Sequence, residues 1–225
     1  MDHRFPKWLR TLVRKLDFLG LPNLGILVCG LGVMAYFAQI SGFSAVDKFL
    51  FDPVAIREGG EWWRLFAFPM SDPSSTPTNP IFFLFFILFT YFIFQSIESQ
   101  WGAGPLTVFV LMSYLSTAAG SLILEFPTNL WHYILLNVSL VFGTLFPNFE
   151  ILLFFILPVK AKWLTLFSGA LLLMQFVLGP ATYKLFLLFA LFPYFLFFGP
   201  YFFTELRTKA RIKANRNKFD KDMWR

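Results

Sequence analysis

Histidine and serine side chains are the first candidates for chemistry in this chain, because a serine hydroxyl beside an imidazole can act as a nucleophile. The chain contains two histidines, His3 and His132, and Ser139 follows His132 by seven residues. Two residues at this spacing share a helix face, but about 10 Å of axial rise separates them. Direct proton transfer needs a heavy-atom distance of roughly 2.6–3.2 Å. The sequence therefore predicts that His132 and Ser139 do not form a dyad within one helix.

Three further serines, Ser113, Ser116 and Ser121, could meet His132 from a neighbouring helix. A serine inside a membrane helix commonly donates its hydroxyl to a carbonyl one turn earlier, and we favour that interpretation. Cys29 lies in an apolar run and is interpreted as a small packing residue. The sequence has no Cys or His spacing typical of a metal site. We therefore expect no metal and no cofactor.

The elements that position these residues are predicted to be membrane-spanning helices. Hydrophobic residues make up 57% of the chain, which has 33 phenylalanines, while charged residues make up only 14%. A helix needs about 20 apolar residues to cross a hydrocarbon core of roughly 30 Å. Single charges separate runs of that length here, which predicts an all-α polytopic membrane protein. The predicted spans are residues 23–42, 80–97, 105–124, 131–146, 163–178 and 185–203.

Basic residues predict the orientation of the bundle, because lysine and arginine in short flanks stay cytoplasmic. An even number of spans with the amino terminus inside places fifteen basic residues in the cytoplasm and four outside. Residues 1–22 are predicted to form a basic amphipathic cytoplasmic segment, residues 23–203 the membrane domain, and residues 204–225 a basic cytoplasmic tail. We interpret the tail as a topology anchor and expect no nucleic-acid partner. The short loops favour a bacterial inner membrane.

Two connections differ from plain loops. The loop over residues 43–79 is rich in aromatic residues, and Trp62, Trp63 and Arg64 suit the headgroup layer, so it is predicted to lie sideways in the outer leaflet. Residues 151–159 are too few to cross and are predicted to form an interfacial or re-entrant connection. The uncharged part of the second span, residues 81–97, measures about 26 Å. A span that short would thin the bilayer locally.

Two motifs on either side of the second span resemble those of a known family. The run Gly60-Glu61-Trp62-Trp63-Arg64-Leu65 resembles the GExWR motif of the rhomboid superfamily of intramembrane serine proteases, and Ile97-Glu98-Ser99-Gln100-Trp101-Gly102 resembles its LExxxG motif. The turn Leu145-Phe146-Pro147-Asn148 after the fourth span is similar as well. The resemblance implies a rhomboid-like bundle of six helices with an outward, membrane-embedded loop between helices 1 and 2. The residues it singles out are Glu61, Trp62, Trp63, Arg64, Glu98, Trp101 and Gly102.

The residues that active rhomboids use for catalysis are missing at the matching positions. Such enzymes carry a serine in a GxSG motif on the fourth span, a histidine on the sixth, and a histidine and an asparagine on the second that hold the oxyanion. Here Phe82 and Phe86 stand at the two second-span positions, and phenylalanine has no donor for a developing negative charge. The fourth span has no GxSG motif, and the sixth has no histidine.

The resemblance and the missing dyad together suggest a catalytically inactive, derlin-like pseudoprotease that binds transmembrane segments or perturbs the local bilayer. An active intramembrane serine protease is one alternative, and a membrane carrier or channel is another. No charged residue lies near the middle of a predicted span and no repeated half is visible, which disfavours a carrier.

Two further patterns concern packing. Asn137 lies in the middle of the fourth span, where a structural hydrogen bond and a contact with a bound segment are both open interpretations. The pairs Ala38-x-x-x-Gly42 and Ser116-x-x-x-Gly120 are of the small-xxx-small type that lets helices approach closely.

Overall fold

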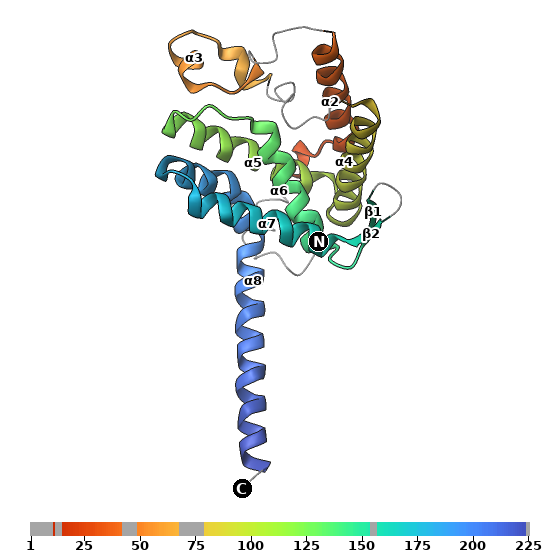
Figure 1. Ribbon diagram of the computed structural model, residues 1–225, viewed down its shortest axis with the longest axis vertical. Coiled ribbons are helices and arrows are strands. Elements are labelled where there is room, and N and C mark those ends of the chain that lie inside the picture. The colour runs from red at the N-terminus through yellow and green to blue at the C-terminus, as the bar shows by residue number, and fades with distance from the viewer. Residues whose placement is uncertain (1–10, 12–14, 42–48, 68–78, 154–156, 224–225) are drawn as a thin grey trace.

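The computed structural model describes residues 11, 15–41, 49–67, 79–153 and 157–223. This part of the chain is mostly helical, with one short β-hairpin (Figure 1). Its elements in chain order are η1 (Asp17–Leu19), α2 (Leu24–Ile40), α3 (Pro53–Arg57), η3 (Trp62–Leu65), α4 (Pro80–Trp101), α5 (Ala103–Leu124), α6 (Leu130–Leu145), β1 (Glu150–Leu153), β2 (Leu157–Lys160), α7 (Ala161–Leu178) and α8 (Ala181–Met223).

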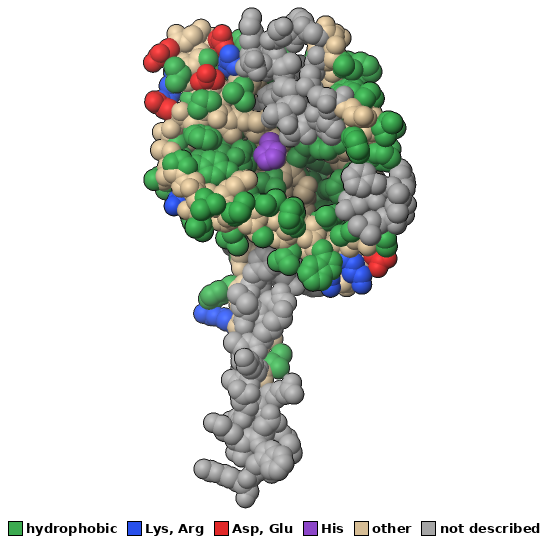
Figure 2. Space-filling model, viewed as in Figure 1, with side chains coloured by type: hydrophobic (Ala, Val, Ile, Leu, Met, Phe, Trp, Pro, Cys, Tyr) green, Lys and Arg blue, Asp and Glu red, His purple; other side chains and the backbone are tan. Residues whose placement is uncertain are grey.

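Four helices are long and apolar enough to cross a membrane: α4, α5, α7 and the part of α8 over Ala181–Pro200. Helices α2 and α6 are equally apolar but shorter, at 17 and 16 residues. Hydrophobic side chains dominate the visible face of the molecule in Figure 2, and the few charged side chains lie at its margins. These findings support the prediction of a helical membrane protein.

The loop that contains α3 and η3 lies at one end of the bundle, and the hairpin β1–β2 lies at the other. At the loop end, the backbone of Phe51 pairs with that of Thr128 just before α6, with N–H···O distances of 3.2 and 2.9 Å. At the hairpin end, Glu150 pairs with Lys160 across the antiparallel strands. We call these two ends the loop end and the hairpin end.

Helix α6 is the centre of the bundle and packs against α4, α5, α7 and α8. Close approach depends on glycine: a Cβ at Gly143 of α6 would overlap the side chain of Thr165 on α7. On the neighbouring pair, a Cβ at Gly120 of α5 would lie 2.5 Å from the Cβ of Phe189 on α8. The hydroxyl of Ser116 donates to the carbonyl of Phe189 at 2.5 Å. The predicted close contact at Ser116 and Gly120 is therefore confirmed.

Aromatic side chains fill much of the interior. Trp101 at the end of α4 stacks on Phe197 and Phe198 of α8, with ring centroids 6.0 and 5.8 Å apart, and meets Phe109 of α5 edge to face. Such contacts join three helices at the hairpin end. Offset and edge-to-face aromatic pairs of this kind add roughly 0.5–1.5 kcal/mol beyond their buried area.

The structure refines two predictions about the elements. The predicted connection over residues 151–159 contains two paired strands, because Glu150–Leu153 and Leu157–Lys160 pair with each other and satisfy their backbone groups at the hairpin end. Helix α4 runs to Trp101 and so measures about 33 Å. The last turn of this helix contains the polar residues Glu98, Ser99 and Gln100, and the helix ends before Gly102. The second helix is therefore not short, and its length gives no support to local thinning.

Helix α8 is a single helix of 43 residues that continues through the residues predicted as a separate tail. Its distal part extends well beyond the other helices (Figure 1). The predicted amphipathic segment falls largely on residues 1–10 and 12–14, outside the described residues, as do His3 and Gly42.

The first testable prediction compares two glycines at a helix crossing. Gly143→Ala is expected to lower the stability of the purified protein by about 1–3 kcal/mol, because the added methyl group collides with Thr165. Gly169→Ala on α7 meets nothing within 4 Å and is expected to be neutral or mildly stabilising. Thermal unfolding in detergent measures both variants. Equal melting temperatures for the two would contradict the crossing described here.

Candidate functional site

None of the described elements covers one narrow face of helix α6. Successive side chains turn by about 100° around a helix axis, so His132, Leu135 and Ser139 follow one another along a single face. The side chains of His132 and Ser139 are exposed, and that of Leu135 is partly exposed. We call this face the α6 stripe. It places the polar side chains of His132 and Ser139 on the outside of a mostly apolar helix.

The α6 stripe lies between α4 and α7. Phe142 of α6 contacts Phe92 of α4 with ring centroids 5.8 Å apart. On the other side, Gly143 packs on Thr165 of α7. Viewed along the axis of α6, Ser139 falls between the directions of these two contacts. Helices α5 and α8 cover the opposite faces, so the opening to Ser139 is lateral.

The two polar residues of the stripe, His132 and Ser139, lie at two different positions along the axis of α6. His132 lies in the first turn of α6, where its backbone N–H donates to the side-chain oxygen of the capping residue Asn129 at 3.3 Å. Its ring meets that of Tyr133 edge to face, with centroids 5.3 Å apart. Ser139 follows two turns later, about 10 Å along the axis. At that separation the imidazole cannot take the proton of this hydroxyl directly.

The serines of α5 serve the fold. Their hydroxyls all donate to backbone carbonyl oxygens, which is the partner that an apolar environment demands. The pairs are Ser113 with Phe109 at 2.9 Å, Ser116 with Phe189 at 2.5 Å, and Ser121 with Phe126 at 2.6 Å. Bonding to the preceding turn, as expected from the sequence, is confirmed for Ser113. The other two hydroxyls use a carbonyl on α8 and one beyond the end of α5.

Asn137 faces α8 and is fully buried. Its amide nitrogen donates to the carbonyl of Tyr133 at 3.0 Å and to that of Ala190 on α8 at 2.8 Å. Its amide oxygen has no hydrogen-bond partner among the described residues. The geometry supports the structural interpretation of Asn137, because the side chain joins two helices and points away from the stripe.

The first motif forms a compact unit within the loop. Arg64 is 7% exposed, donates from Nε to the carboxylate of Glu61, and donates from Nη1 to the carbonyl of Leu50 at 2.7 Å. Its guanidinium carbon lies 5.1 Å from the ring centroid of Trp63. Trp62 and Trp63 are exposed, at 62% and 41%. Glu61 and Arg64 therefore fix the loop from within, and the two tryptophans project from it.

Residues that the sequence did not single out join this loop to the bundle. The guanidinium of Arg57 donates to the carboxylate of Glu125 at 3.0 Å and to the carbonyl of Leu122 at 2.6 Å. The hydroxyl of Tyr114 donates to the carbonyl of Leu65 at 2.7 Å. These contacts link positions 49 to 68 residues apart in sequence. No local pattern marks such pairs, so the sequence alone gives no signal for them.

The second motif forms a joint at the hairpin end. The carboxylate of Glu98 accepts a hydrogen bond from the backbone N–H of Asn23 at 2.8 Å. Trp101 is buried between α5 and α8. Gly102 separates α4 from α5 at a φ of +90°, a conformation that residues with a side chain rarely adopt. Glu98, Trp101 and Gly102 thus set the angle between two helices and hold the chain that leads into α2.

The predicted site residues therefore do not form one site. The group from Glu61 to Arg64 lies at the loop end of α5, and the group from Glu98 to Gly102 lies at its other end. A helix of 22 residues such as α5 is about 33 Å long. Phe82 is 47% exposed and Phe86 is partly exposed. Neither ring offers a hydrogen-bond donor to a bound group.

The comparisons with known proteins add no relative. No family model matches the chain, and neither a curated protein nor a solved structure matches it. In the part of the chain that the structure describes, no group of three or more His, Cys, Asp or Glu residues could hold a metal ion. Among the described residues, the α6 stripe is a candidate site for binding.

The second testable prediction compares two arginines of the loop. Arg64→Ala is expected to speed proteolysis of the loop more than Arg57→Ala. Removal of the buried guanidinium leaves Glu61 and the Leu50 carbonyl without this donor, at about 1–3 kcal/mol. The pair of Arg57 with Glu125 is half-exposed, and such pairs contribute about 0–1 kcal/mol. Chymotrypsin digestion in mild detergent gives the rates, and equal rates would oppose the prediction.

Proposed function

We propose that this chain is a rhomboid-like membrane protein without protease activity that binds a transmembrane segment of another protein along the α6 stripe. The six crossings of this proposal are α2, α4, α5, α6, α7 and α8. Both termini lie in the cytoplasm of a bacterial cell, in line with the fifteen basic residues that this orientation places inside. Two motifs support the resemblance to rhomboids, one in the loop at residues 60–65 and one at the end of α4 at residues 97–102.

The observation that carries the proposal is the lateral exposure of Ser139 between α4 and α7. Polar side chains that face the bilayer are unfavourable, and they are found where a partner can meet them. A transmembrane helix with a small polar residue supplies such a partner, because it can approach closely and exchange a hydrogen bond. The stripe is narrow and apolar at Leu135, which suits one helix.

Separate observations support the part of the proposal that the protein has no protease activity. A hydrolytic serine needs a base within hydrogen-bonding reach and donors for the oxyanion. Ser139 is two turns from His132 on one helix, and phenylalanines stand at the two positions of α4 where donors are needed. The hydroxyls of Ser113, Ser116 and Ser121 are engaged by carbonyl oxygens.

The third testable prediction concerns catalysis. A serine-directed fluorophosphonate is expected to label the reconstituted protein at no more than the level of the Ser139→Ala variant. Labelling is read by in-gel fluorescence, with an active rhomboid protease as the positive control. Stoichiometric labelling that disappears in Ser139→Ala would instead establish an intramembrane protease, the alternative function.

The fourth testable prediction concerns the bound helix. Two synthetic leucine-rich transmembrane peptides, identical except for one central serine, are added to liposomes that contain the protein with a fluorophore near α6. The serine peptide is expected to bind about threefold to sixteenfold more tightly, since an interhelical hydrogen bond in a membrane contributes roughly 0.6–1.7 kcal/mol.

The matched controls for this experiment are two serine substitutions. Ser139→Leu is expected to abolish the preference for the serine peptide. Ser99→Leu, at an exposed serine near the end of α4 away from the stripe, is expected to retain it. Equal binding of both peptides to the unmodified protein, or loss of the preference in Ser99→Leu alone, would refute binding along the stripe.

A further inference from the structure

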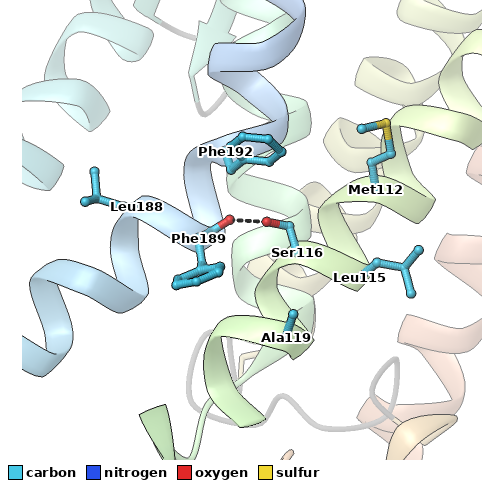
Figure 3. A pocket seen from close by; sticks show the side chains of 7 residues that line it. All are labelled: Met112, Leu115, Ser116, Ala119, Leu188, Phe189 and Phe192. Carbon is cyan, nitrogen blue, oxygen red and sulfur yellow. Dashed lines mark hydrogen bonds between the residues drawn. The ribbon is translucent and has the colours of Figure 1, made fainter. Parts of the chain in front are cut away.

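An open groove of about 530 Å³ lies between α5 and α8 (Figure 3). Its lining residues are Met112, Leu115, Ser116 and Ala119 of α5, and Leu188, Phe189 and Phe192 of α8. Helices α5 and α8 cover the faces of α6 opposite the stripe, so the groove is a different surface from the candidate site. Its volume falls in the range of about 300–1,000 Å³ typical of ligand sites.

The groove results from the way the two helices meet. Gly120 and Ser116 allow α8 to approach α5 closely at Phe189. The side chains of Ser116 and Ala119 are small and form the floor of the groove. The larger side chains of α5 and α8 form its two walls. Leu115 is 56% exposed, and Leu188 and Phe192 are each 51% exposed. The result is a furrow with apolar walls on the outside of the bundle.

The lining selects an apolar occupant. Ser116 is the only lining residue with a polar side-chain group, and its hydroxyl already donates to the carbonyl of Phe189 at 2.5 Å (Figure 3). The groove therefore offers no side-chain hydrogen bond to a polar ligand. Both of its helices are long and apolar enough to cross a membrane, so in a bilayer the furrow opens onto hydrocarbon. An unfilled furrow would lose dispersion contacts along its whole length.

A cation lies where the headgroup of such an occupant would be. Lys184 precedes Leu188 by one helical turn, about 6 Å closer to the loop end. Its side chain is partly exposed and forms no ion pair with any described residue. Lysine near a bilayer surface attracts anionic lipid, and its long stem can reach the headgroup layer.

We propose that an anionic phospholipid binds this surface, with one acyl chain in the α5–α8 groove and its phosphate at Lys184. The inference rests on insertion of the bundle in a bilayer and is independent of helix binding at the α6 stripe. Ala119 and Lys184 set the two halves of the site, because one leaves room for the chain and the other supplies the charge.

The test uses the full-length protein in nanodiscs with a phospholipid that carries a photoreactive diazirine in its acyl chain. Cross-linked peptides are quantified by mass spectrometry for a phosphatidylglycerol probe and a phosphatidylcholine probe. The groove residues Leu115 and Leu188 are expected to be labelled above Leu173 and Val177, which are exposed on α7 at 67% and 68%.

Two substitutions separate the halves of the site. Ala119→Phe fills the groove and is expected to reduce its labelling to that of α7, whereas Ala170→Phe, at an exposed alanine of α7, is expected to leave it unchanged. Lys184→Gln is expected to lower labelling by the phosphatidylglycerol probe about fivefold without affecting the phosphatidylcholine probe. Lys162→Gln, an exposed lysine at the hairpin end, is the matched control.

Groove labelling equal to that of α7 in the unmodified protein would overturn the proposal. So would labelling that persists in Ala119→Phe. A Lys184→Gln variant that labels like the unmodified protein would overturn the role of the lysine. Size-exclusion chromatography and thermal unfolding confirm that each variant is folded, and Ala119→Leu, a smaller filling substitution, replaces Ala119→Phe where it is not.

Discussion

Hydrogen bonding in an apolar environment is the constraint on which this structure depends. A polar group inside hydrocarbon cannot form a hydrogen bond with water and needs a hydrogen-bond partner within the protein. The hydroxyls of α5 donate to carbonyls, and Asn137 joins α6 to α8. Thr144 likewise donates to the carbonyl of Leu140 and lies 2.7 Å from the hydroxyl of Tyr194. Polar groups in the interior thus hold the helices together, whereas a polar group that faces outward can contact a partner outside the bundle. Ser139 is such a group.

The same constraint explains how one helix can be central and still reach the surface. The lack of a side chain at Gly120 lets α8 pack closely on α5. The lack of a side chain at Gly143 likewise lets α7 pack closely on α6. Helix α7 remains the least enclosed of the four long apolar helices, with 6% of its span buried inside the bundle. Because α4 and α7 approach α6 from two sides without closing over Ser139, the stripe faces sideways. A cavity open to water would require a different arrangement.

Much of the fold follows from composition and spacing, and the parts that do not have identifiable causes. Apolar runs locate α4, α5, α6 and α7 to within a few residues. The end of α4 lies beyond the prediction because its last turn contains polar residues, which a count of apolar residues does not register, and the helix ends only before Gly102 with its φ of +90°. The hairpin at Glu150–Lys160 was missed because a short apolar run with a proline fits several conformations. The shared face of His132 and Ser139 is predictable from their spacing, but its lateral opening depends on where α4 and α7 pack. Likewise, Arg57 and Glu125 are brought together only by the tertiary fold.

The lateral exposure of Ser139 in a bilayer is the central claim, and spin labelling tests it most directly. In a Cys29→Ala background, nitroxide labels are placed at Ser139→Cys, at the exposed Leu115→Cys and at the buried Val138→Cys, and their collision rates with oxygen and with a water-soluble nickel complex are compared in liposomes. The account predicts that the label at residue 139 meets oxygen about as often as the one at residue 115 and far more often than the one at residue 138, with little access to nickel. A label at residue 139 as shielded as that at residue 138 would contradict it.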